Sequence, residues 1–178
     1  MRLFIAIELP ENVKEQLSRL RTAIPDARWV TPGQLHLTLA FLGHVPAETQ
    51  AALEQRLAAI HLPCFFLCFT RTGCFPNRRR PRVVWAGVKP EPLLDALAAR
   101  IRETVLSCGI HQEERPFSPH ITLARIKARN STTVPPFSEQ AIQSDIPPVE
   151  VREFTLFSSS LGAAGAVHTV IKSFQLGV

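Results

Sequence analysis

The chain has 178 residues, enough for one domain or for two small lobes that share a core. Hydrophobic residues make up 46% and charged residues 20%, which excludes a wholly disordered protein, and no apolar run reaches the roughly 18 to 20 residues that span a bilayer. The net charge of +5 is compatible with a polyanionic partner but does not require one.

In the first half of the chain, alternating apolar residues predict strands, and apolar residues at a spacing of three and four predict helices. The expected elements in chain order are a strand at 2–9, a helix from Pro10 to about Pro25, a short strand at 27–30, a strand at 35–42 ended by Gly43, a helix after Pro46, and strands at 65–72 and 82–88.

The second half continues in a similar way. The expected elements are a helix from about Pro92 to Gly109, a strand at 120–126, a polar loop at 127–136, a weak helix at 137–144, and strands at 151–158 and 167–176. The four cysteines lack the spacing of a disulfide scaffold or a zinc site. We expect buried free thiols, and therefore a cytoplasmic protein.

An internal repeat relates the two halves. The run Gln34-Leu35-His36-Leu37-Thr38-Leu39-Ala40 matches Ser118-Pro119-His120-Ile121-Thr122-Leu123-Ala124 at an offset of 84 residues. The same offset places strand 65–72 near 149–156 and strand 82–88 on 166–172, while strand 2–9 resembles strand 82–88 at an offset of about 80. The repeat predicts an α+β fold of two pseudo-symmetric lobes, each with an antiparallel sheet flanked by helices. We expect residues 1–178 to form one bilobed domain.

The two repeated motifs carry the candidate chemistry. Residues i and i+2 of a strand share a face, so His36 points with Thr38, and His120 points with Thr122. A two-fold relation would bring the pairs together, with two imidazoles as acid and base and two hydroxyls on a phosphate. This arrangement suits in-line hydrolysis of a phosphodiester. No carboxylate cluster suited to magnesium accompanies it, so we expect chemistry without a metal or cofactor.

A single His-x-Thr pair is more simply explained as ordinary strand residues, because threonine favours strands and histidine can lie in a core. Two pairs at matching positions of a repeat make that explanation weak. The other histidines, His44, His61, His111 and His168, lack both the paired threonine and a repeat partner, and we leave them out of the site.

The motifs His36-Leu37-Thr38-Leu39 and His120-Ile121-Thr122-Leu123 resemble those of the two-histidine (2H) phosphoesterases. The segments Arg2-Leu3-Phe4-Ile5-Ala6-Ile7, Arg82-Val83-Val84-Trp85 and Arg115-Pro116-Phe117-Ser118-Pro119-His120 are similar to the bacterial and archaeal RNA 2′,3′-cyclic phosphodiesterases, also called 2′-5′ RNA ligases. The similarity extends over essentially the whole chain.

The resemblance implies a bilobed fold with a central V-shaped cleft and hydrolysis of 2′,3′-cyclic phosphates to 2′-phosphates. It implies that His36 is the proton donor to the departing ribose 3′-oxygen and that His120 is the proton acceptor from water, an order that pseudo-symmetry makes easy to exchange. It further implies reversible, ATP-independent 2′-5′ ligation, with a 5′-hydroxyl replacing water.

Two positions lie five residues after the histidines. The resemblance implies that Arg125 contacts phosphate, but simple alternation places it on the face opposite His120, so it needs a β-bulge to reach the site. If Arg125 reaches the site, Phe41 should reach it too and stack on a base. Otherwise Phe41 is a core residue.

The loop 76–82 contains four arginines, of which Arg78, Arg79 and Arg80 are candidates for contacts with the RNA backbone. A solvated hairpin tip is the alternative. We expect a monomer whose partner is RNA with a 2′,3′-cyclic phosphate end, tRNA fragments among the candidates. The rival functions are a non-catalytic RNA-end binding module and a 2H phosphodiesterase acting on 2′-5′ oligonucleotides or an ADP-ribose cyclic phosphate.

Overall fold

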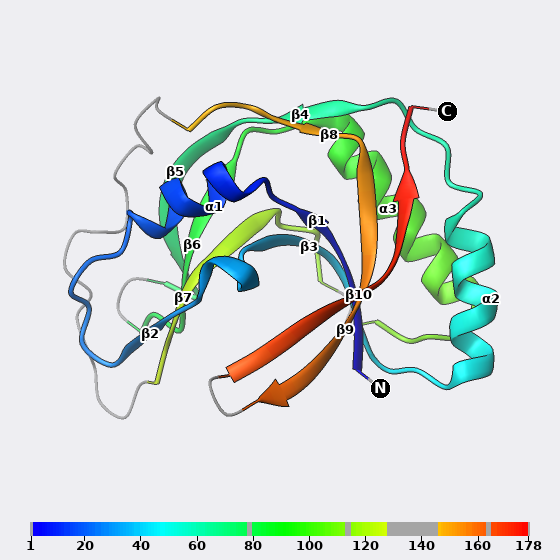
Figure 1. Cartoon of the computed structure of the whole chain (residues 1–178), viewed down its shortest axis with the longest axis horizontal. Coiled ribbons are helices and arrows are strands. Elements are labelled where there is room, and N and C mark those ends of the chain that lie inside the picture. The colour runs from blue at the N-terminus through cyan, green and yellow to red at the C-terminus, as the bar shows by residue number, and fades with distance from the viewer. Residues whose placement is uncertain (1, 78–79, 113–114, 128–145, 163–164, 178) are drawn as a thin grey trace.

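A computed structural model of the chain describes residues 2–77, 80–112, 115–127, 146–162 and 165–177 (Figure 1). The described elements are β1 (Arg2–Glu8), α1 (Glu11–Ser18), β2 (Ala27–Trp29), the 3-10 helix η1 (Pro32–Gln34), β3 (His36–His44), α2 (Ala47–Leu57), β4 (Phe65–Leu67), β5 (Phe69–Phe75), β6 (Val83–Val88), α3 (Pro92–Ser107), β7 (His120–Ile126), β8 (Val149–Val151), β9 (Glu153–Gly162) and β10 (Gly165–Gln175). This confirms the predicted α+β class with antiparallel strands.

The main sheet has the strand order β10-β9-β1-β3-β7-β6-β5, with β2 paired to β7, and β4 and β8 form a separate two-stranded sheet. Its two halves meet at the motif strands, where Leu37 pairs with Ile121. In the small sheet Phe66 pairs with Glu150. Both pairs join residues 84 positions apart, so a pseudo-two-fold axis passes through both.

The repeat is therefore visible in the topology. β1 and β6 take equivalent places beside β3 and β7, and β9 and β5 take equivalent places outside them. The prediction that 65–72 corresponds to 149–156 is confirmed. The superposition of 82–88 on 166–172 is wrong, because β6 lies inside the sheet whereas β10 lies at its edge, and no described strand takes the equivalent place beyond β5.

Three further predictions need correction. The lobes do not have separate main sheets, since β3 pairs with β7. The strand expected at 65–72 breaks at Cys68 into β4 and β5, which belong to different sheets. The first helix ends at Ser18, with Arg19 as its C-cap, instead of near Pro25. The helix expected at 137–144 lies outside the described residues.

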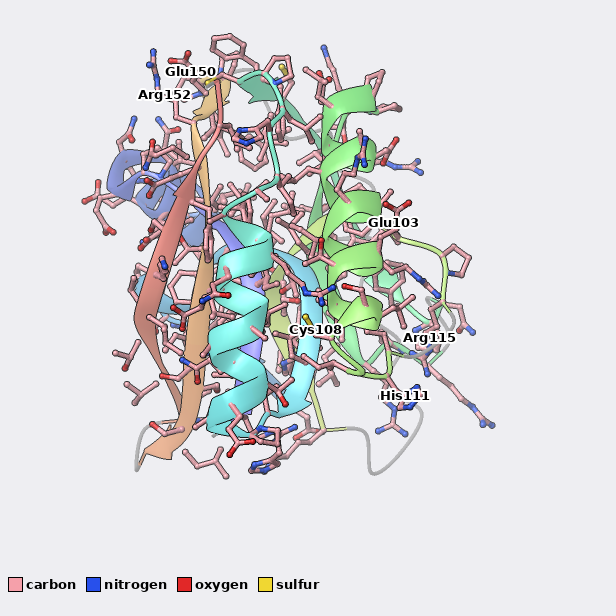
Figure 2. All side chains as sticks on the ribbon, turned by 90° about the vertical axis from the view of Figure 1, so that its right-hand side faces the viewer. Glu103, Cys108, His111, Arg115, Glu150 and Arg152 are labelled. Carbon is pink, nitrogen blue, oxygen red and sulfur yellow. The ribbon has the colours of Figure 1, made fainter. Side chains whose placement is uncertain are left out.

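The helices α2 and α3 run side by side along one flank of the sheet (Figure 2). Glu91 caps α3 by accepting a hydrogen bond from the Leu93 N–H at 3.1 Å, and Gly109 follows the helix with a φ of 74° that favours glycine. Along α3, Leu94, Leu97 and Ile101 are fully buried.

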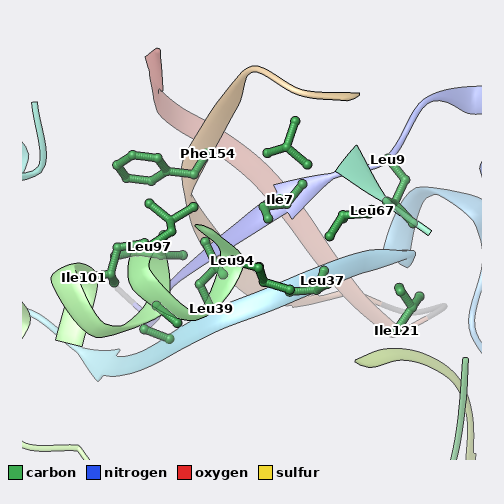
Figure 3. Packing of buried hydrophobic residues seen from close by; sticks show 14 of the residues in the cluster. Ile7, Leu9, Leu37, Leu39, Leu67, Leu94, Leu97, Ile101, Ile121 and Phe154 are labelled. Carbon is green, nitrogen blue, oxygen red and sulfur yellow. The ribbon is translucent and has the colours of Figure 1, made fainter. Parts of the chain in front are cut away.

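The main core lies between these helices and the sheet. Figure 3 shows the α3 leucines packed with side chains from β1, β3, β7 and β9. Leu37 and Ile121, the pair at the pseudo-two-fold axis, point into this core. Their neighbours in the two strands therefore point to the opposite face, which is the face that carries the candidate site.

That opposite face has its own small apolar cluster, formed by Phe4, Ala6 and Phe157. The rings of Phe4 and Phe157 stack at 5.1 Å between centroids. As a result β1 is buried on both faces, and the motif strand β3 lies against an ordered aromatic surface. Within the described ranges, no helix has the length and apolarity needed to cross a membrane.

Candidate active site

The pairing of Leu37 with Ile121 brings the two motifs together. The antiparallel register that follows from this pair places His36 across from Thr122, and Thr38 across from His120. Residues two apart on a strand share a face, so these four side chains lie on one face of the sheet, with the histidines diagonal to one another. All four are half-buried. The arrangement suits one phosphate with an imidazole on either side.

A β-bulge in each motif strand changes the direction of the residues that follow. Thr38 pairs with Ala6 but Ala40 pairs with Ile5, so Leu39 is an extra residue. In the other half, the register shift between Val84 and Trp85 has the same effect at Leu123. Both strands then show the same succession of burial, with two consecutive buried residues before an exposed one.

The bulges turn Phe41 and Arg125 to the face that carries the histidines. Simple alternation along a regular strand would have placed both side chains on the opposite face. Phe41 is 66% exposed, so it is not a core residue. The positive charge of Arg125 acts on both His36 and His120. The charge of one guanidinium therefore lowers the pKa of a histidine in each half.

Each histidine ring is held by the backbone carbonyl two residues before it. His120 Nδ1 lies 2.7 Å from the Ser118 carbonyl oxygen, and the ring of His36 makes the equivalent backbone hydrogen bond to Gln34. A carbonyl only accepts, so this ring nitrogen carries a proton. The other ring nitrogen of each neutral imidazole is then a free acceptor, as a base requires.

The pKa of His36 is lowered to about 4, mainly by burial. The charges of His168, Arg125 and Lys14 also lower this pKa, whereas the backbone hydrogen bond to Gln34 raises it. Burial also lowers the pKa of His120, with a further contribution from Arg125 and an opposing one from Ser118. Both imidazoles are therefore neutral in the free protein at neutral pH. An anion between them would raise both pKa values.

These shifts predict an acid-sensitive fold. The folded protein holds His36 neutral, so below pH 6.5 the unfolded chain binds more protons and stability is lost as the pH falls toward 4. For His36 alone the loss is about 3 kcal/mol. Urea unfolding at pH 7 and pH 4 should therefore show a smaller pH effect in His36→Gln than in the wild type. The exposed His61 provides the control, because His61→Gln should keep the full pH effect.

Aromatic side chains support both histidines. The Phe4 ring lies 5.0 Å from His36, and the Phe75 ring lies edge-on at 5.0 Å from His120. Trp85, opposite Thr122, lies over Gly73, where a β-carbon would collide with the indole. Glycine is required at this position because any side chain would displace the tryptophan.

The sequence prediction missed three charged or titratable residues near this face. His168 on β10 lies 5.1 Å from His36 between ring centroids. Lys14 on α1 is 4% exposed and forms ion pairs with Glu8 and Glu11 at 3.2 and 2.8 Å. Arg28 on β2 is the cross-strand partner of Arg125. His168 was difficult to identify from the sequence, because it has neither a threonine two residues later nor a partner in the internal repeat.

The arginine loop is only partly described. Arg78 and Arg79 lie outside the described residues. Arg80 is exposed, and its backbone N–H donates to the Asn77 Oδ1 at 3.1 Å. In the described part of the chain, no group of three or more His, Cys, Asp or Glu side chains is placed to hold a metal ion.

Comparison with known proteins gives consistent results. The family model described as LigT like Phosphoesterase matches residues 7–85 and 88–168, which divides the chain close to the repeat. The RNA 2′,3′-cyclic phosphodiesterase of Escherichia coli is 38% identical over 98% of this chain and 96% of its own length. The protein of the same name from Thermus thermophilus is 40% identical over 99% and 90%.

Among solved structures, Escherichia coli LigT in apo form has a TM-score of 0.84 and 35% identity, covering 99% of this chain and 98% of its own. The same protein has been solved with 3′-AMP, with a TM-score of 0.81, 36% identity and coverage of 98% and 97%. The family model, the curated relatives and the solved structures all extend over nearly the full chain. The chain belongs to the LigT-like family of 2H phosphoesterases.

Proposed function

We propose that this chain hydrolyses the 2′,3′-cyclic phosphate at an RNA end to a 2′-phosphate, with His36 and His120 as the acid–base pair. Relatives that this chain covers to 96% and 90% of their length are named RNA 2′,3′-cyclic phosphodiesterases, and LigT has been solved with 3′-AMP. The single observation that carries the proposal is the Leu37–Ile121 pair, because it sets two His-Thr pairs around one point.

In the proposed reaction, the free ring nitrogen of His120 takes a proton from water as the water oxygen attacks phosphorus. The bond from phosphorus to the ribose 3′-oxygen breaks, and His36 gives that oxygen a proton. The product carries a 2′-phosphate and a 3′-hydroxyl. Hydroxyls of Thr38 and Thr122 and the guanidinium of Arg125 hold the non-bridging oxygens, where negative charge develops.

The donor role requires a protonated His36, although its pKa in the free protein is about 4. The phosphate anion bound beside the ring favours the protonated form and raises this pKa. Proton uptake at His36 would then accompany substrate binding, which fits a site whose two histidines are neutral in the free protein.

We assign the binding of the RNA chain to Phe41 and to the arginines of the loop 76–82. Phe41 is exposed beside the motif and would stack on a base, and Arg78, Arg79 and Arg80 would follow the backbone. A 5′-hydroxyl in place of water would run the same step as 2′-5′ ligation. We further propose that the two lobes act as one monomeric domain, because each supplies one histidine, and that the protein works in the cytoplasm, where its four free thiols stay reduced.

The experiment that tests this function is incubation of the protein with a 2′,3′-cyclic-phosphate oligonucleotide in the presence of EDTA. We expect a 2′-phosphate product, identified by its resistance to a 3′-specific phosphatase, at a rate that EDTA leaves unchanged. Tight binding without turnover would favour the RNA-end binding module, and loss of activity in EDTA would contradict the metal-free mechanism.

A further inference from the structure

A third histidine lies against one of the two motif histidines. The ring of His168 on β10 is 5.1 Å from the ring of His36, with an interplanar angle of 72°. It also packs edge-on against Phe4 at 4.8 Å. The His36 ring therefore contacts two aromatic rings, Phe4 on the neighbouring strand and His168 on the edge strand.

This contact is unexpected from the strand order. β10 and β3 are separated by β9 and β1, so in a flat sheet they would be about 14 Å apart. The contact exists because the β9–β10 hairpin curls over the face of the sheet. A register shift between Val170 and Lys172 interrupts the pairing of β10 with β9, and such irregularities bend a strand.

The tip of the hairpin is fixed to the segment that precedes His36. Gln34 Nε2 donates to the Ala166 carbonyl oxygen at 2.7 Å. Gly165 has a φ of 127°, and a β-carbon there would lie 2.7 Å from the Arg28 guanidinium. The same Gln34 supplies the backbone hydrogen bond of His36, so one residue positions both the hairpin and the catalytic ring.

In the described part of the chain, the other half of the site has no equivalent. His120 packs on Phe75, a ring that does not titrate, and none of the described strands takes a place beside β5 equivalent to that of β10. The pseudo-symmetric pair of histidines is thus made asymmetric by one added strand. The histidine that contacts this added strand is His36, the proposed proton donor.

We propose that His168 is a positioning residue for His36, which holds the His36 ring against Phe4 so that its free nitrogen faces the phosphate. The proposal rests on the proposed function of His36. His168 also affects the charge of the site, because its positive form disfavours a second positive charge on His36.

The groups that face His36 come from four elements. Lys14 on α1 and Arg125 on β7 lower its pKa, as does His168 on β10, and Glu8 lies opposite it on β1. Replacing His168 by phenylalanine removes one of the three positive contributions and keeps a ring in contact. The pKa of His36 should therefore rise in His168→Phe, while that of His120, which His168 does not affect, should stay unchanged.

The test compares His168→Ala, His168→Phe and the control His61→Phe, which changes an exposed histidine outside the site. We expect His168→Ala to lower kcat about tenfold with KM nearly unchanged, because the phosphate ligands remain. His168→Phe should recover most of kcat. In the pH–rate profile of this variant, the limb that reports the titration of His36 should move to higher pH. The control should match the wild type.

NMR titration of the His36 ring gives a readout that does not depend on activity. An upward pKa shift in His168→Phe, absent in His61→Phe, supports the proposal. Unchanged kcat in His168→Ala together with an unchanged His36 titration in His168→Phe would overturn it. A wild-type protein that titrates as described but does not cleave a cyclic phosphate would instead overturn the proposed function.

Discussion

Replacing His36 or His120 by alanine is expected to lower kcat/KM for hydrolysis of a 2′,3′-cyclic phosphate end by about 10²- to 10⁴-fold. Each substitution removes one proton transfer, and the remaining histidine cannot supply both because they lie on opposite corners of the site. The measurement is a steady-state assay on a short RNA. Thr38→Ala and Thr122→Ala should have smaller effects, since each removes one hydrogen bond to the phosphate.

The two histidine roles can be separated with a substrate in which sulfur replaces the 3′-bridging oxygen. A thiolate leaves without a proton, so the variant that lacks the acid should regain much of its activity and the variant that lacks the base should not. We expect rescue in His36→Ala. Rescue in His120→Ala alone would exchange the roles, and rescue in both would show that neither histidine acts as the base.

Arg125→Ala is expected to lower kcat/KM by about 10- to 100-fold, as for the loss of a charge-assisted hydrogen bond of roughly 1.5–3 kcal/mol. It should also raise the pKa values of His36 and His120, because the guanidinium charge lowers both. Both limbs of the pH–rate profile should then move to higher pH. No single surface contact with RNA would produce that shift.

Two variants control this experiment. Arg125→Lys keeps the charge but loses the planar pair of donors, so it should restore the pH profile better than the rate. Arg100→Ala removes an exposed arginine from α3, away from the motif strands, and should leave both unchanged. A pH profile in Arg125→Ala identical to that of the wild type would contradict the effect of the Arg125 charge on the two histidines.

The four motif residues could be predicted from the sequence because they depend only on the period of a strand and on a repeat. The positions of Phe41 and Arg125 could not be decided in the same way, since one extra residue reverses the direction of a side chain. A signal was present in the consecutive apolar residues Leu-Ala that precede both positions, which leave no alternation.

His168 was excluded for lack of a local motif. Its contact with His36 depends on the curl of a hairpin three strands away, and no pattern within β10 encodes that curl. The break at Cys68 escaped detection for a related reason. No glycine or proline marks a break at Cys68, and only the pairing of β4 with β8 separates β4 and β5 into different sheets.

The meeting of β3 and β7 at one residue pair has a consequence for how the protein can be tuned. Two identical half-length chains associating about a true two-fold axis would build the same four-residue site, but symmetry would force both histidines to have the same surroundings. Joining the halves in one polypeptide removes that constraint. A change near one histidine then need not be repeated at the other, so an acid and a base can evolve independently from two copies of one motif.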